Sequence, residues 1–187
     1  RCFACTLLLC VRGRVLRAKG NYDKAEEAFN EVLRLNPRAA AARVELARLR
    51  VRSGAEDAVD VATQAAKADP ASVEARVTLV RALMQRREFA KAQAALDDLL
   101  KAAPNVAVVH TQLGVLRGLK NDGEGARAAF TRALELDPLQ LEAINGLTAV
   151  DLAAGRKQEA LARVDALATQ APKNVNALMV AAQAHAS

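Results

Sequence analysis

The five prolines of this 187-residue chain recur at an almost constant interval. They are Pro37, Pro70, Pro104, Pro138 and Pro172, and 33, 34, 34 and 34 residues separate them. Proline cannot donate a backbone hydrogen bond and pushes the preceding residue out of the helical region, so it ends a helix at a defined length. A constant period of about 20–50 residues is typical of stacked structural repeats. The prolines therefore predict one unit repeated five times.

Two further columns keep the register of the prolines. Twelve residues before each proline stand Ala25, Ala58, Ala92, Ala126 and Ala160. Eight residues before each proline stand Phe29, Ala62, Leu96, Phe130 and Val164, all apolar. The chain has 43 alanines and only 3% aromatic residues, a composition that favours close-packed helices over sheets. We expect the alanine column to lie where two helices cross closely, so that a larger side chain would overpack the crossing.

Residues that tolerate a left-handed backbone stand between the expected helices of each unit. Gly20, Gly54 and Gly155 fall where a first helix is expected to end, and Asn121 and Arg87 occupy the same place in the other two units. Glycine, and sometimes asparagine, closes a helix in this conformation, whereas arginine suits it poorly. Each unit is therefore predicted to be a helix, a tight turn, a second helix and a closing proline.

This pattern resembles the tetratricopeptide repeat (TPR) family, whose 34-residue helix–turn–helix carries an L-G pair, an A-x3-F step and a closing proline. The fourth unit matches best, with Leu113-Gly114, Ala126, Phe130 and Pro138. The first unit has Arg12-Gly13 instead of an apolar–small pair, which predicts weaker packing of the amino-terminal helix.

The resemblance implies an all-α, right-handed TPR-type solenoid of antiparallel helix pairs, forming a single domain over residues 1–187. Its expected units are residues 6–38, 39–72, 73–106, 107–140 and 141–174, with a partial sixth unit at 175–187. The Ala-rich texture, with Arg favoured over Lys, is also weakly similar to long bacterial TPR lipoproteins of exopolysaccharide and protein-sorting systems. This points to a bacterial protein and leaves the cytoplasm, the periplasm and the cell envelope open.

The net charge of +6 is unevenly distributed. Residues 1–54 hold 12 Lys or Arg against 5 Asp or Glu, whereas residues 55–187 hold 15 against 16. The first quarter is therefore either the docking site of an acidic partner or a solvated helix face. Nucleic acid is the third choice, because the chain has no Trp and one Tyr and lacks aromatic side chains interleaved with basic ones.

Residues suited to catalysis or metal binding are scarce. The two histidines, His110 and His185, are 75 residues apart in an array whose units contact only their neighbours. The cysteines Cys2, Cys5 and Cys10 have no second cluster to complete a metal site, so we expect them to be small packing residues. The sequence predicts no enzyme, no small-molecule substrate, no cofactor and no metal. No apolar run reaches the roughly 18 residues of a membrane span.

In TPR folds the first helices of successive units line the concave groove where partners usually bind. At one equivalent position of these helices, the first three units carry Arg14, Arg48 and Arg81, and about one turn further lie Arg17 and Arg52. Arginine holds carboxylates through two parallel hydrogen bonds, so we predict these five residues as the site for an acidic or carboxylate-ended peptide.

The equally weighted alternative is that these arginines pair with Glu45 and Glu74 inside the groove. The later units present an apolar groove instead, with Val115, Leu119 and Leu152 as its predicted contacts. The predicted function is a protein–protein interaction scaffold or adaptor. The alternative is an assembly module that forms homo-oligomers through its exposed end helices.

Overall fold

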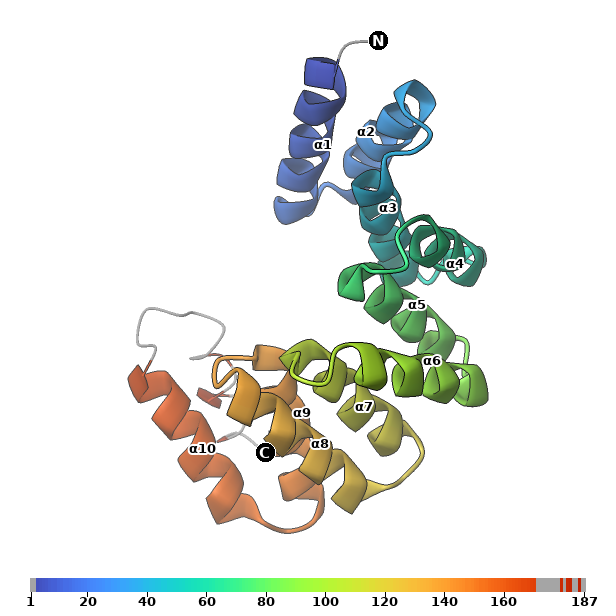
Figure 1. The fold of residues 1–187 in the computed structure, drawn as a ribbon. Helices are drawn as coiled ribbons and strands as arrows, with labels where there is room; N and C mark the ends of the chain where they lie inside the picture. Colours follow the sequence, from blue (N-terminus) through green and yellow to red (C-terminus); the bar gives the residue numbers. More distant parts are fainter. Residues whose placement is uncertain (1–2, 171–178, 180, 183–184, 186–187) are drawn as a thin grey trace. The chain divides into compact units, whose positions relative to one another are not determined.

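The computed structural model describes residues 3–170 together with 179, 181, 182 and 185, and is helical throughout residues 3–170 apart from turns. The helices are α1 (Phe3–Ala18), α2 (Tyr22–Leu35), α3 (Ala40–Ser53), α4 (Ala58–Ala68), α5 (Val73–Gln85), α6 (Phe89–Ala102), α7 (Ala107–Leu119), α8 (Gly123–Leu136), α9 (Leu141–Ala153) and α10 (Lys157–Gln170). They follow one another as helix–turn–helix pairs (Figure 1). The all-α prediction is confirmed over these residues.

The turn inside each helix pair has the left-handed residue that the sequence predicts. The φ angles are +77° at Gly20, +69° at Gly54, +59° at Arg87, +62° at Asn121 and +75° at Gly155. Arg87 and Asn121 are the non-glycine residues with positive φ in the described part of the chain. The repeat geometry therefore imposes this conformation even where the residue type disfavours it.

The second helix of each pair ends two residues before a proline. Helices α2, α4, α6 and α8 stop at Leu35, Ala68, Ala102 and Leu136, ahead of Pro37, Pro70, Pro104 and Pro138. Pro172 lies outside the described residues. The prolines therefore act as predicted, because each forces the residue before it out of the helical conformation.

The two residue columns form the core. Four of the alanines, at positions 25, 92, 126 and 160, are fully buried, and Ala58 is 2% exposed. All five residues of the second column are buried, with Phe29 at 0% and Phe130 at 3% exposure. The burial of these alanines agrees with the expectation that two helices cross closely at this column.

The expectation that the Arg12-Gly13 pair weakens the packing of α1 is wrong. A Cβ atom added to Gly13 would lie 2.7 Å from the Phe29 ring, so the glycine lets α1 approach this ring closely. Gly114 lies equally close to the Phe130 ring in the fourth repeat, since a Cβ added to Gly114 would lie 2.6 Å from that ring. Leu9, half-buried Cys10 and Leu16 of α1 also pack on the cluster around Phe29. The small residue of the pair, rather than its apolar neighbour, is what the packing requires.

The chain divides into two compact units, Arg1–Ala95 and Leu96–Ser187. In the first unit, one apolar cluster joins α1, α2 and α3 through Phe29, and another joins α3, α4 and α5 through Ala62. In the second unit, Phe130 and Leu147 join α8 to α9, and Ile144 and Val164 join α9 to α10. The five repeat boundaries and the single-domain organisation stay predictions, and most of the expected sixth unit lies outside the described residues.

None of the helices within the described residues is both long and apolar enough to cross a membrane. Cys2 lies outside the described residues, so the predicted packing role is open there.

Candidate functional site

The predicted arginines of the first unit gather around one buried carboxylate. Glu45, on α3, is 2% exposed. Arg14 of α1 donates its Nε–H to Glu45 Oε1 at 2.8 Å, and Arg17 Nε lies 3.1 Å from Glu45 Oε2. The hydrogen bond to Glu45 raises the pKa of Arg14 above its ordinary value. Glu45 therefore fixes the direction of two arginine side chains that α1 alone would leave free.

Arg48 links this carboxylate to the next helix pair. Its Nη1 lies 3.9 Å from Glu45 Oε2 and also pairs with Glu74 on α5. The alternative expectation, that arginines pair with Glu45 and Glu74, is thus confirmed for Arg14, Arg17 and Arg48. These pairs leave donors to spare, because each guanidinium carries five N–H groups. Pairing with Glu45 and binding a further anion are therefore compatible.

Four of the five predicted arginines line one pocket of about 550 Å³ in the first unit. We call it the arginine pocket, and its lining is Arg17, Tyr22, Arg48, Leu49, Val51, Arg52, Thr78 and Arg81. Among the described residues, none that lines this pocket carries a carboxylate, and α1, α2, α3 and α5 all contribute to the lining. Arg14 instead lines a smaller pocket of about 180 Å³ that also contains Glu45 and Glu74. The sequence register therefore found most of this cationic site.

Tyr22 is the pocket residue that sequence reasoning missed. The guanidinium carbon of Arg52 lies 4.3 Å from the centre of the Tyr22 ring, a cation–π arrangement. Among the described residues Arg52 forms no ion pair, so its hydrogen-bond donors stay available. The signal was present in the sequence, since the only tyrosine of the chain directly follows the Gly20 turn and begins α2.

The three predicted apolar contacts belong to the second unit. Val115 is half-buried and packs on the Phe130 cluster, Leu152 is half-buried, and Leu119 is 50% exposed. A pocket of about 500 Å³ in this unit is lined by residues of α8, α9 and α10, none of them among these three. Their role as partner contacts stays a prediction.

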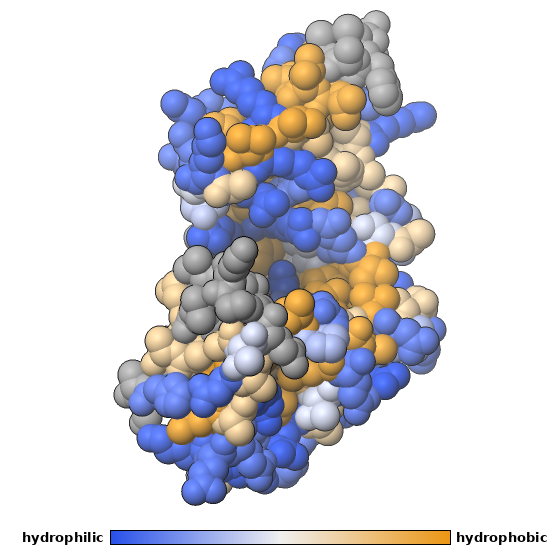
Figure 2. All heavy atoms as spheres, turned by 90° about the vertical axis from the view of Figure 1, so that its left-hand side faces the viewer, coloured by the Kyte–Doolittle hydropathy of each residue, from blue (hydrophilic) through white to orange (hydrophobic). Residues whose placement is uncertain are grey.

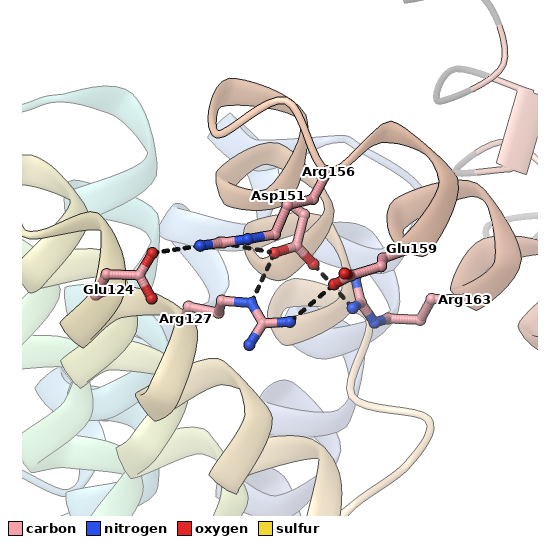
Figure 3. A network of polar contacts seen from close by, with 6 residues as sticks. All are labelled: Glu124, Arg127, Asp151, Arg156, Glu159 and Arg163. Carbon is pink, nitrogen blue, oxygen red and sulfur yellow. Dashed lines mark hydrogen bonds and ion pairs between the residues drawn. The ribbon is translucent and has the colours of Figure 1, made fainter.

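A second buried carboxylate, Asp151 of α9, organises the polar contacts of the second unit (Figure 3). It is fully buried and accepts hydrogen bonds from Arg127 Nε at 2.9 Å and Arg163 Nη2 at 2.8 Å. Arg156 Nη1 lies 3.6 Å from its Oδ1. The outer partners of the arginines are Glu159, 3.0 Å from Arg127 Nη2, and Glu124, 2.5 Å from Arg156 Nη2.

The pKa of Asp151 reflects two opposing effects. Burial favours the neutral acid and raises the pKa, but the hydrogen bonds from Arg127 and Arg163 outweigh burial. The pKa of Asp151 therefore ends below its ordinary value, and the group stays ionised at neutral pH. Because each carboxylate oxygen of Asp151 accepts a hydrogen bond from an arginine of the same unit, we assign Asp151 a role in joining α8, α9 and α10.

Comparisons with known proteins agree with this architecture. Two family models described as tetratricopeptide repeat match, one over residues 7–39 and the other over residues 55–113. A thermophilic TPR protein of Thermus thermophilus has a similar structure, with a TM-score of 0.88 and 25% identity over 97% of this chain and 100% of that one. None of the curated proteins matches the sequence.

Two further structures share the fold at lower identity. Yeast Tom70 gives a TM-score of 0.72 at 20% identity, over 97% of this chain and 39% of its own. The Cut9–Hcn1 hetero-tetramer of APC/C gives 0.80 at 16%, over 96% and 36%. These likenesses bear on the fold alone. The weaker likeness to envelope lipoproteins of sorting systems gains no support from the comparisons.

The fold is that of TPR solenoids, which generally mediate protein–protein interactions and are typically not enzymes. In the part of the chain that the structure describes, no three His, Cys, Asp or Glu side chains lie close enough to hold a metal ion.

Proposed function

We propose that this chain, two stretches of which match models of the tetratricopeptide repeat, is an interaction scaffold whose arginine pocket binds an acidic segment or terminal carboxylate of a partner protein. The observation that carries the proposal is the pocket of the first unit, where four arginines and no carboxylate are found among the described lining residues.

The charge balance of the site supports an anionic ligand. Arg14, Arg17, Arg48 and Arg52 contribute four positive charges, whereas their ion-pair partners Glu45 and Glu74 contribute two negative ones. Glu45 is paired with Arg14 and Arg17, which compensate its negative charge. The excess of positive charge attracts an anion from solution and orients it.

The shape of the pocket favours a peptide over a bare ion. Leu49, Val51 and the Tyr22 ring give it an apolar wall beside the guanidinium groups. A carboxylate with an adjacent aliphatic or aromatic side chain fills both parts. Each Arg–carboxylate hydrogen bond contributes about 1.5–3 kcal/mol.

The test is fluorescence anisotropy with labelled eight-residue acidic peptides, each prepared with a free and an amidated carboxyl end. We expect binding that weakens as salt rises, because surface charge pairs are screened. The double variant Arg52→Gln/Arg81→Gln is expected to bind at least tenfold more weakly, since about 1.4 kcal/mol corresponds to a factor of ten. It leaves the arginines around Glu45 intact.

The matched control is Arg34→Gln. Arg34 pairs with Glu31 on the exposed side of α2, and its side chain is 69% exposed and outside the pocket. The control is expected to bind as the unmodified chain does. Equal affinity of the double variant, or no binding of any acidic peptide, would refute the proposal. A loss of affinity on amidation identifies the terminal carboxylate as the bound group, whereas no loss identifies the acidic side chains.

A further inference from the structure

The charge around the arginine pocket exceeds what one carboxylate can balance. Two carboxylates, Glu45 and Glu74, are set against four arginines of the site, which are Arg14, Arg17, Arg48 and Arg52. The first three arginines pair with these carboxylates, and Arg52 forms no ion pair among the described residues. Four positive charges therefore meet two negative ones, and an excess of two positive charges remains for a ligand.

A phosphate monoester matches this excess better than other common anions do. It carries a charge of about −1.5 to −2 at pH 7 and has three terminal oxygens that accept strong hydrogen bonds. A carboxylate has one charge and two oxygens, and a single arginine occupies both oxygens when it binds through two parallel hydrogen bonds. Each phosphodiester group of a nucleic acid also carries one charge. The monoester alone of these three balances the site.

The arginines of the pocket are accessible to a ligand. The side chains of Arg17 and Arg48 are 38% and 34% exposed, and Arg52 is exposed as well. The Tyr22 ring, 4.3 Å from the guanidinium carbon of Arg52, holds this group in place without neutralising it. Figure 2 shows that hydrophilic side chains cover much of the first unit on the side turned to the viewer. Phosphate oxygens can therefore meet guanidinium groups of both α1 and α3.

The size of the pocket favours a phosphorylated side chain over a free phosphate ion. Its volume of about 550 Å³ lies within the range of about 300–1,000 Å³ that is usual for pockets of organic ligands. Leu49, Val51 and the Tyr22 ring line it together with the arginines, so the carbon atoms next to a phosphate would lie on an apolar surface. Resting on the proposed function, we infer that the acidic group recognised in the arginine pocket is the phosphate monoester of a phosphorylated side chain in the partner protein.

The probes are four labelled eight-residue peptides that differ at one central position, which is phosphoserine, phosphotyrosine, glutamate or serine. Their ends are acetylated and amidated and their other positions are alanine, glycine and leucine, so the central side chain supplies the charge. Fluorescence anisotropy with the whole chain measures binding at pH 7.5 and low salt. A phosphate adds one to three charge-assisted hydrogen bonds, so we expect at least one phosphorylated peptide to bind about tenfold more tightly than the glutamate peptide. The tighter of the two phosphorylated peptides identifies the residue type.

The pH dependence of binding distinguishes a phosphate from a carboxylate. The second pKa of a phosphate monoester is about 6, so the dianion fraction, and with it the affinity, is expected to rise up to about fourfold from pH 5.5 to 7.5. The first unit contains no histidine, and arginine stays protonated throughout this range. The glutamate peptide, with an ordinary pKa near 4.3, is expected to bind equally over the range. Any titration of Glu45 or Glu74 would change the binding of the glutamate peptide as well.

The variant Arg52→Lys keeps the charge of the pocket and removes the planar group that binds two phosphate oxygens at once. We expect it to bind the phosphorylated peptide about tenfold more weakly, which corresponds to the loss of one charge-assisted hydrogen bond. The matched control is Arg34→Lys, at a side chain 69% exposed and outside the pocket, which is expected to bind normally.

The outcomes separate this inference from the proposed function. Equal affinity for the glutamate and phosphorylated peptides would overturn the inference and leave the proposed function intact. Unchanged binding of the phosphorylated peptide by Arg52→Lys would also overturn it, and so would tighter binding of a labelled single-stranded oligothymidylate, which would assign the pocket to nucleic acid. Absence of binding by all three charged peptides would count against both the inference and the proposed function.

Discussion

Arg127 donates its Nε–H to the buried Asp151 at 2.9 Å, in the place where the first unit has an ion pair of the opposite polarity, Glu26 with Arg50 at 2.7 Å. Arg127 and Glu26 both stand eleven residues before a repeat proline, and Asp151 and Arg50 both stand thirteen residues after it. The contact between the second helix of one repeat and the first helix of the next therefore accepts the acidic residue on either helix. The two residues at these positions only need to carry opposite charges.

Removing the carboxylate of the second unit is expected to destabilise the chain. Asp151→Asn leaves Arg127, Arg156 and Arg163 close together without their common counter-ion. Breaking a buried pair costs about 3–5 kcal/mol. Because these arginine side chains are 24–36% exposed, solvent screening reduces the expected loss to about 2–3 kcal/mol. Urea unfolding at pH 7 measures it. Glu124→Gln, at a side chain 74% exposed, is the control, with an expected change below about 0.5 kcal/mol.

The contribution of Asp151 is also expected to depend on pH. Its pKa in the folded chain lies below the ordinary value near 3.8 that it regains on unfolding. The stabilisation is therefore complete above that unfolded value and is lost as the pH falls through the lower folded pKa. The difference in unfolding free energy between the unmodified chain and Asp151→Asn is expected to be constant from pH 5 to 7 and to narrow below about pH 4. A constant difference down to pH 2.5 would contradict this assignment.

Gly114→Ala is expected to destabilise the second unit through overpacking. The added Cβ would lie 2.6 Å from the Phe130 ring, and the same ring also lies against Gly146, where a Cβ would be 2.3 Å away. The ring therefore has no room to move. We expect a loss of about 1–3 kcal/mol in thermal or urea unfolding. Adding Phe130→Leu is expected to recover part of the loss, whereas a purely local effect on helix α7 would not respond to that second change.

Arg87→Gly is expected to stabilise the first unit. Arg87 has a φ of +59°, a conformation that costs an ordinary residue about 1–2 kcal/mol and glycine almost nothing. Part of this gain is lost to the greater flexibility of glycine in the unfolded chain, so we expect about 0.5–1 kcal/mol. Asn121→Gly, at a φ of +62°, is the comparison and is expected to gain less, because asparagine tolerates this region better. An equal gain at both positions would show that residue type is not the cause.

The sequence by itself was enough for the repeated unit. The proline period, the buried alanine column and the five left-handed turn residues are all local or periodic properties, so the chain predicts them without reference to distant residues. The arginine pocket was partly predicted as well, because equivalent positions on successive first helices fall on one face. Arg17, Arg48, Arg52 and Arg81 meet there for that reason.

The tertiary structure alone decided how those side chains are used. The burial of Glu45 and Asp151, the stacking of Arg52 on Tyr22 and the contact of Gly13 with Phe29 depend on the packing distance between helices. Periodicity fixes which face a residue occupies. The partner that it meets on that face is set by neighbouring helices, at residues 12 to 31 positions away in the contacts named here, whose side chains a repeat pattern does not specify.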